Sequence, residues 1–122
     1  MAGEAILAFV PDLMFSVQLR EAASKQGCTI AFVDNSADFS ARLPQVEPAL
    51  VILDLATVGA QADALVRVSK QSGSRIVAFG PHVQTELLAS AERAGCDAVY
   101  PNSKFKMDTE AIIAQWLAAK RG

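Results

Sequence analysis

Residues 48–59 read PALVILDLATVG, and this stretch decides the fold class. A run of aliphatic residues over 49–53 ends at the carboxylate of Asp54, and Gly59 follows five residues later. Continuous apolar runs of this length are typical of strands that are covered on both faces of a parallel sheet. The stretch therefore predicts a parallel strand over 49–54 that delivers one carboxylate to its own carboxyl end.

Strand-like apolar runs alternate with helix-like segments along the chain. Short apolar runs predict four further strands, over residues 5–10, 28–33, 75–79 and 98–100. Segments with one apolar stripe or a cap-type start predict helices over 12–26, 34–43, 60–71, 84–94 and 107–120. Asp108 or Thr109 is the expected cap of the last helix. Five rounds of strand and helix predict one α/β domain over residues 1–122, with helices on both faces of a parallel sheet.

Composition excludes several classes of protein. The 122 residues are 52% hydrophobic and 20% charged, with a formal net charge of −2, which indicates a folded chain and argues against nucleic acid as a partner. The apolar runs fall short of the roughly 18 residues that a membrane span needs, and residues 1–4 do not resemble a signal peptide. We therefore expect a cytoplasmic protein in which Cys28 and Cys96 stay reduced.

Two segments resemble the receiver domain of two-component response regulators. Residues 48–59 are similar to the family's phosphoacceptor segment, and residues 91–105, AERAGCDAVYPNSKF, resemble its stretch from the fourth helix through the fifth strand. The resemblance covers nearly the whole chain. It implies a flavodoxin-like (βα)5 three-layer sandwich with strand order 2-1-3-4-5, and it makes Asp54 the candidate phosphoacceptor.

The resemblance does not extend to the residues that assist phosphorylation. Receivers bind Mg²⁺ with two further acids after the first strand, and a hydroxyl and a lysine contact the phosphoryl oxygens. Here the acid, hydroxyl and lysine positions fall on other residue types: Val10, Pro11, Gly80 and Asn102. Asp12 lies one residue after the acidic pair and is the remaining candidate metal ligand beside Asp54. Lys104 comes two residues too late, so we expect it to face elsewhere.

The candidate residues also have ordinary structural interpretations. Asp54 can cap the loop that follows its strand, and Asp12 can cap the first helix. His82 is the single histidine, which excludes sites that need two, and we expect it on an exposed loop. Pro81 and His82 precede a predicted helix N-terminus, where they could form the rim of a small-ligand site.

Three functions follow from this pattern. The first is an atypical, stand-alone receiver that signals through protein contacts without the Mg²⁺-dependent phospho-switch; it needs no cofactor and is no enzyme. Its partner would be a sensor kinase or a separate output protein, and the resemblance implies a contact surface, also available for homodimers, on residues 84–94, 98–100 and 107–120. The second is a working receiver that catalyses at most its own phosphorylation on Asp54. The third is a flavodoxin-like binder of a small ligand.

Overall fold

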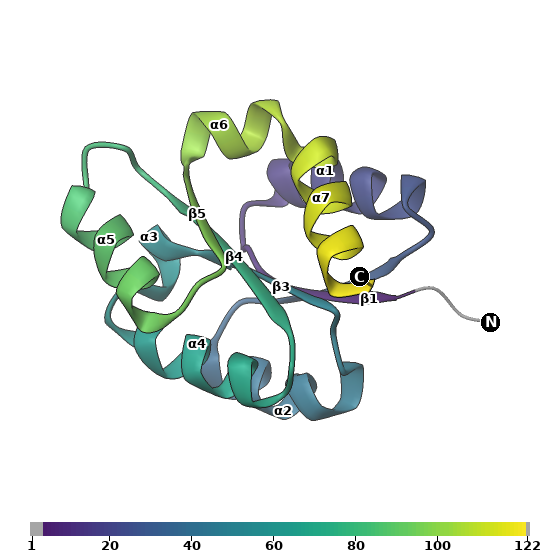
Figure 1. Ribbon diagram of the computed structural model, residues 1–122, viewed down its shortest axis with the longest axis horizontal. Coiled ribbons are helices and arrows are strands. Elements are labelled where there is room, and N and C mark those ends of the chain that lie inside the picture. Colours follow the sequence, from purple (N-terminus) through teal and green to yellow (C-terminus); the bar gives the residue numbers. More distant parts are fainter. Residues whose placement is uncertain (1–3, 122) are drawn as a thin grey trace.

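A five-stranded parallel sheet forms the centre of the molecule (Figure 1). The computed structural model describes residues 4–121, with side chains up to Ala118. The strands are β1 (Ala5–Phe9), β2 (Thr29–Val33), β3 (Leu50–Asp54), β4 (Arg75–Gly80) and β5 (Ala98–Pro101). Their order is β2-β1-β3-β4-β5 and every neighbouring pair is parallel, which confirms the predicted topology. Strand β3 lies in the middle, where both its edges are hydrogen-bonded.

Helices cover both faces of the sheet (Figure 1). The helical elements are α1 (Leu13–Lys25), α2 (Ser36–Val46), α3 (Leu55–Val58), the 3-10 turn η1 (Gly59–Gln61), α4 (Ala62–Gln71), α5 (Thr85–Ala94), α6 (Asn102–Met107) and α7 (Thr109–Arg121). One core cluster joins the sheet to α1, α6 and α7, and a second joins it to α2, α3, α4 and α5. The predicted three-layer sandwich is therefore confirmed.

Strand β3 shows why the apolar run is continuous. Leu50 and Ile52 point into the cluster under α1 and α7, whereas Val51 and Leu53 point into the cluster on the other face. All four are fully buried. Successive side chains of a strand alternate between faces, so a strand covered on both sides needs apolar residues at every position.

Local signals place the helix ends close to their predicted positions. Asp12 caps α1, because its Oδ1 accepts hydrogen bonds from the backbone N–H groups of Met14 at 3.0 Å and Phe15 at 3.1 Å. Gly95 follows α5 with a φ of 119°, a left-handed conformation that favours glycine. The capping role that the sequence predicts for Asp12 is confirmed.

Three parts of the helix prediction were wrong. The helix predicted over 34–43 runs from Ser36 to Val46 and contains Pro44. The segment after β5 forms a separate short helix, α6, before α7 begins at Thr109, whereas the sequence predicted one helix from residue 107. Phe105 is fully buried and anchors α6 through a tertiary contact that local propensity cannot reveal. The helix predicted over 60–71 is preceded by α3 and η1, and its α-helical part starts at Ala62.

Neither cysteine forms a disulfide within the described part of the chain: Cys28 is buried and Cys96 is partly buried. Among the described helices, none combines the length and apolar composition that a membrane crossing requires.

Candidate functional site

Asp54 lies at the carboxyl end of β3 and starts the next helical turn. Its side chain is the N-cap of α3, and Oδ1 accepts a hydrogen bond from the backbone N–H of Ala56 at 3.2 Å. Oδ2 accepts one from the hydroxyl Oγ1 of Thr57 at 3.1 Å. Both carboxylate oxygens are therefore bonded to the loop that Asp54 itself begins, as the structural interpretation of this residue predicts.

The strand positions beside Asp54 carry apolar side chains. The register pairs Asp54 with Phe79 on β4, and it pairs Phe9 with Leu53, so that Val10 follows next to Asp54 on the other side. Val10 and Phe79 are each 2% exposed, and both belong to the cluster under α1, α6 and α7. A carboxylate at either position would lie in an apolar environment, which disfavours its charged form.

An aromatic cluster fills the space next to these positions. The rings of Phe79 and Phe105 stack with centroids 4.7 Å apart and planes at 9°, and Phe15 meets both rings edge-on at 5.5 and 5.7 Å. Tyr100 lies against Phe105, and its hydroxyl accepts a hydrogen bond from the indole N–H of Trp116 at 3.0 Å. The interior next to the end of β3 is thus closed by packed rings.

The residues after β1 do not fit a magnesium site. Mg²⁺ takes oxygen ligands in near-octahedral geometry, but Val10 and Pro11 offer none from their side chains. Asp12 is exposed and its Oδ1 is committed to the start of α1. Within residues 4–121, no group of three or more His, Cys, Asp and Glu side chains is arranged to hold a metal ion.

Gly80 is the residue that the sequence analysis predicts at the hydroxyl position of receivers. It is buried at the end of β4, and a Cβ placed on it would lie 3.1 Å from Cδ2 of Leu88 and 3.3 Å from Cβ of Leu55. These distances are shorter than ordinary van der Waals contacts. A side chain at this position would need these two leucines to give way by a few tenths of an ångström, so they crowd the space that a hydroxyl would take.

Asn102 and Lys104 are the two residues at or near the predicted lysine position. Asn102 begins α6 and is partly buried. The ammonium group of Lys104 pairs with the carboxylate of Asp108 at 2.5 Å, one helical turn away and partly exposed to solvent. The hydrogen bond that Lys104 donates to Asp108 raises the pKa of Lys104. The ammonium group of Lys104 therefore points toward the C-terminal end of its own helix.

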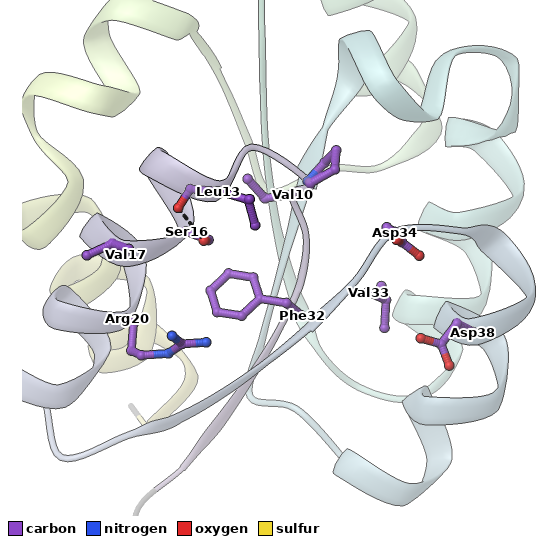
Figure 2. A pocket seen from close by; sticks show the side chains of 10 residues that line it. Val10, Leu13, Ser16, Val17, Arg20, Phe32, Val33, Asp34 and Asp38 are labelled. Atoms are coloured by element: carbon purple, nitrogen blue, oxygen red, sulfur yellow. Dashed lines mark hydrogen bonds between the residues drawn. The ribbon is translucent and has the colours of Figure 1, made fainter.

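A pocket of about 550 Å³ lies one strand away from Asp54, between α1 and the end of β2 (Figure 2). Val10 and Pro11 form one edge of it, but Asp54, Gly80 and Asn102 do not line it. Pro81 and His82, the predicted rim of a ligand site, do not line it either. His82 is exposed on the loop before α5, as the sequence predicts.

Sequence reasoning missed the groups that close the site. The contacts of Phe15, Phe79 and Phe105 arise from three elements far apart in the chain. One feature of the sequence could have indicated that Phe105 is buried: it is a large apolar residue that lies outside the apolar stripe of the last helix. The pocket at α1 also had a signal, because Leu13 and Val17 are apolar residues outside the buried face of that helix.

Comparison with known proteins places the fold among response regulators. No family model matches the sequence, and no curated protein matches it. A response regulator structure from Hahella chejuensis is 20% identical with a TM-score of 0.83, covering 97% of this chain and 98% of that chain. A response regulator from Thermotoga maritima is 13% identical with a TM-score of 0.79, covering 94% and 98%.

Longer proteins contain the same fold. Full-length FixJ from B. japonicum is 18% identical with a TM-score of 0.80, and the match covers 98% of this chain and 60% of FixJ. Structural likeness at these identities shows the fold. The chain therefore has the flavodoxin-like receiver fold that its sequence predicts.

Proposed function

We propose that this chain is an atypical receiver, a signalling module that acts through protein contacts without the Mg²⁺-dependent phospho-switch. The observation that supports the proposal is the set of contacts around the carboxylate of Asp54. Both of its carboxylate oxygens are bonded to its own loop, and its strand neighbours are the buried apolar residues Val10 and Phe79. A phosphoryl group on Asp54 would find neither a metal nor a cation to stabilise its charge.

The same residues argue against a switch that reaches the helices. A phosphate switch needs a charged or hydrogen-bonding group that changes partner and moves an element with it. At the two positions where receivers couple the phosphoryl group to their helices, this chain has Gly80 and Asn102. Lys104 is paired with Asp108 on its own helix. The proposed module is therefore held in one state by its packing.

Partners would be other signalling proteins in the cytoplasm. The receiver-like contact surface predicted from the sequence consists of α5, β5 and α7, and it stays part of this proposal. A net charge of −2 does not favour phosphate-rich partners.

Two measurements test the proposal. Purified protein is incubated with acetyl phosphate and Mg²⁺, and its intact mass is followed with time beside a receiver that keeps both acids and the lysine. We expect no phosphoryl adduct on this chain while the second receiver is modified. In the source cells, Asp54→Asn is compared with deletion of the gene, and we expect a signalling defect in the deletion alone.

The control is Asp54→Asn in the purified protein, which separates modification of this residue from reaction elsewhere. An adduct that forms on the wild type and disappears in Asp54→Asn would contradict the proposal. It would instead support a working receiver that uses Asp54 as phosphoacceptor. A cellular defect of Asp54→Asn equal to that of the deletion would point the same way.

A further inference from the structure

The pocket beside α1 is an open groove lined by both apolar and charged side chains (Figure 2). Leu13 and Val17 on α1 and Phe32 on β2 supply its apolar surface. Leu13 is 82% exposed and Val17 is 52% exposed, and the neighbouring Met14 is 87% exposed. Small-molecule sites enclose most of their ligand's surface. Because the side chains that line this groove are largely exposed to solvent, the groove would enclose little of a small ligand. It is better suited to bind a segment of another protein.

The wall formed by α1 has the spacing of a helix-packing ridge. Leu13, Val17 and Arg20 are related as i, i+4 and i+7, so they follow one stripe along α1. Figure 2 shows these side chains along one side of the groove and Phe32 pointing toward them. Two helices pack by placing such ridges in each other's grooves. The geometry therefore favours a helix as the occupant.

The two ends of the groove carry opposite charge. At one end the guanidinium of Arg20 lies over the ring of Phe32, 5.2 Å from its centroid. Asp34 and Asp38 lie at the other end, beyond Val33 (Figure 2). None of these three charged groups takes part in the ion pairs found among residues 4–121, although Oδ1 of Asp34 accepts a hydrogen bond from the side-chain amide of Asn35 at 3.0 Å. Their charges can therefore pair with those of a partner, and the two carboxylates would repel nucleic acid or an anionic lipid surface.

We propose that this groove binds an amphipathic helix of a partner protein, and this inference rests on the proposed function in protein–protein signalling. The apolar face of the helix covers Leu13, Val17 and Phe32. An acidic residue of the helix pairs with Arg20, and a basic residue at its other end pairs with Asp34 and Asp38. The site is separate from Asp54 and from the surface formed by α5, β5 and α7.

Photo-cross-linking in the source cells tests this groove. A benzophenone amino acid replaces Val17 in the groove or, in a second and matched variant, Val83, an apolar residue 74% exposed on the loop before α5. We expect an adduct with one partner protein at position 17 and its reduction by about tenfold with Arg20→Glu or Asp38→Lys. Arg67→Glu on α4 is the matched charge reversal away from the groove and should leave the adduct unchanged.

A synthetic peptide of the cross-linked segment provides the second measurement. We expect the peptide to be an amphipathic helix whose affinity for the full chain falls with Arg20→Glu and recovers when the peptide's acidic residue is changed to lysine. Lack of an adduct at position 17, or an adduct that survives both charge reversals, would overturn the inference. So would an adduct with nucleic acid, lipid or a second copy of the chain.

These outcomes are separable from failure of the proposed function. An adduct at position 83 alone would remove the groove as a docking site and leave a protein-binding module that uses another surface. Formation of an aspartyl phosphate on Asp54 would overturn the proposed mechanism of signalling without affecting the groove.

Discussion

Val10→Asp is the substitution that most directly probes the apolar packing beside Asp54. It places a carboxylate at one of the two positions that the resemblance predicts for the acids of receivers, but Val10 is 2% exposed and belongs to the cluster of Phe15, Phe79 and Phe105. Burial in such an environment raises the pKa of a carboxyl group by up to roughly 3–5 units. The introduced carboxyl therefore stays protonated in the folded chain at neutral pH.

The cost of that burial can be worked out from linkage. An Asp titrates near 3.9 in the unfolded chain and each pKa unit is worth about 1.4 kcal/mol, so holding the proton at neutral pH costs about 4 kcal/mol. Loss of the buried valine side chain adds about 1.5 kcal/mol. A total of about 5.5 kcal/mol is comparable to the whole stability of a small domain. We expect Val10→Asp to be close to unfolding at neutral pH.

The pH dependence has a definite sign. Because the folded-state pKa is raised above the unfolded value, the penalty is present above that unfolded value and shrinks as the pH falls toward about 4. Urea unfolding followed by circular dichroism, at neutral and mildly acidic pH, measures both effects. Leu13→Asp, at a position 82% exposed, is the control and should stay within about 0.5 kcal/mol of the wild type.

The reasoning would be refuted by a small effect of Val10→Asp at neutral pH. A loss below about 1 kcal/mol would mean that the position opens to solvent next to Asp54. A rise in the unfolding midpoint on adding Mg²⁺ to the same variant would show that two carboxylates meet there after all.

Three further outcomes are expected. Asp54→Ala should lower the free energy of unfolding by about 1 kcal/mol, whereas Asp54→Asn should cost less than about 0.5 kcal/mol because its amide oxygen can still cap α3. Phe105→Ala should cost about 3–5 kcal/mol, because its ring stacks on Phe79 in the closed interior. Burial, followed by the charge of Asp97, raises the pKa of the Cys96 thiol to about 12. Cys96 should therefore resist alkylation by iodoacetamide at neutral pH, and its contribution to stability should fall as the pH rises above 9.0, its ordinary value.

Each of these outcomes has a control and a result that would contradict it. For the cap, equal losses with alanine and asparagine would show that Asp54 does not stabilise α3 through its oxygen. For the aromatic cluster, Phe105→Leu keeps most of the volume, and a loss as large as that of alanine would point to something other than packing. For the thiol, Cys96 should react rapidly once the chain is unfolded in urea, and equally rapid reaction in the native protein would disprove its burial.

The sheet could be predicted from the sequence because its signal is local. Every strand that was predicted agrees with the structure to within one residue at each end. A strand that is buried on both faces needs a continuous run of apolar residues, and such a run is visible in the sequence. Helix ends marked by Asp12 or Gly95 were predicted for the same reason. Capping and left-handed turns depend on residues next to each other in the sequence.

The candidate site could be predicted only in part, because the side chains that pack around it come from elements far apart in the sequence. The sequence alone predicts that Val10 and Pro11 stand at the acidic positions of receivers, but it does not predict the stacking of Phe105 on Phe79. The two leucines that approach Gly80 come from α3 and α5, and no local pattern places them there. The groove beside α1 forms only because β2 and the start of α2 lie next to that helix. In the sequence alone, its apolar residues look like an irregular apolar stripe on a helix.

The measurement that tests the central claim most directly is the amide spectrum of the ¹⁵N-labelled chain with Mg²⁺ and beryllofluoride, which mimics an aspartyl phosphate. The amides to watch are those of Ala56, Thr57 and Gly80, together with the helix α5. We predict that they keep their chemical shifts, because Asp54 lacks the ligands and cations that would hold the mimic. Saturable shifts at these amides that vanish in Asp54→Asn would contradict the claim.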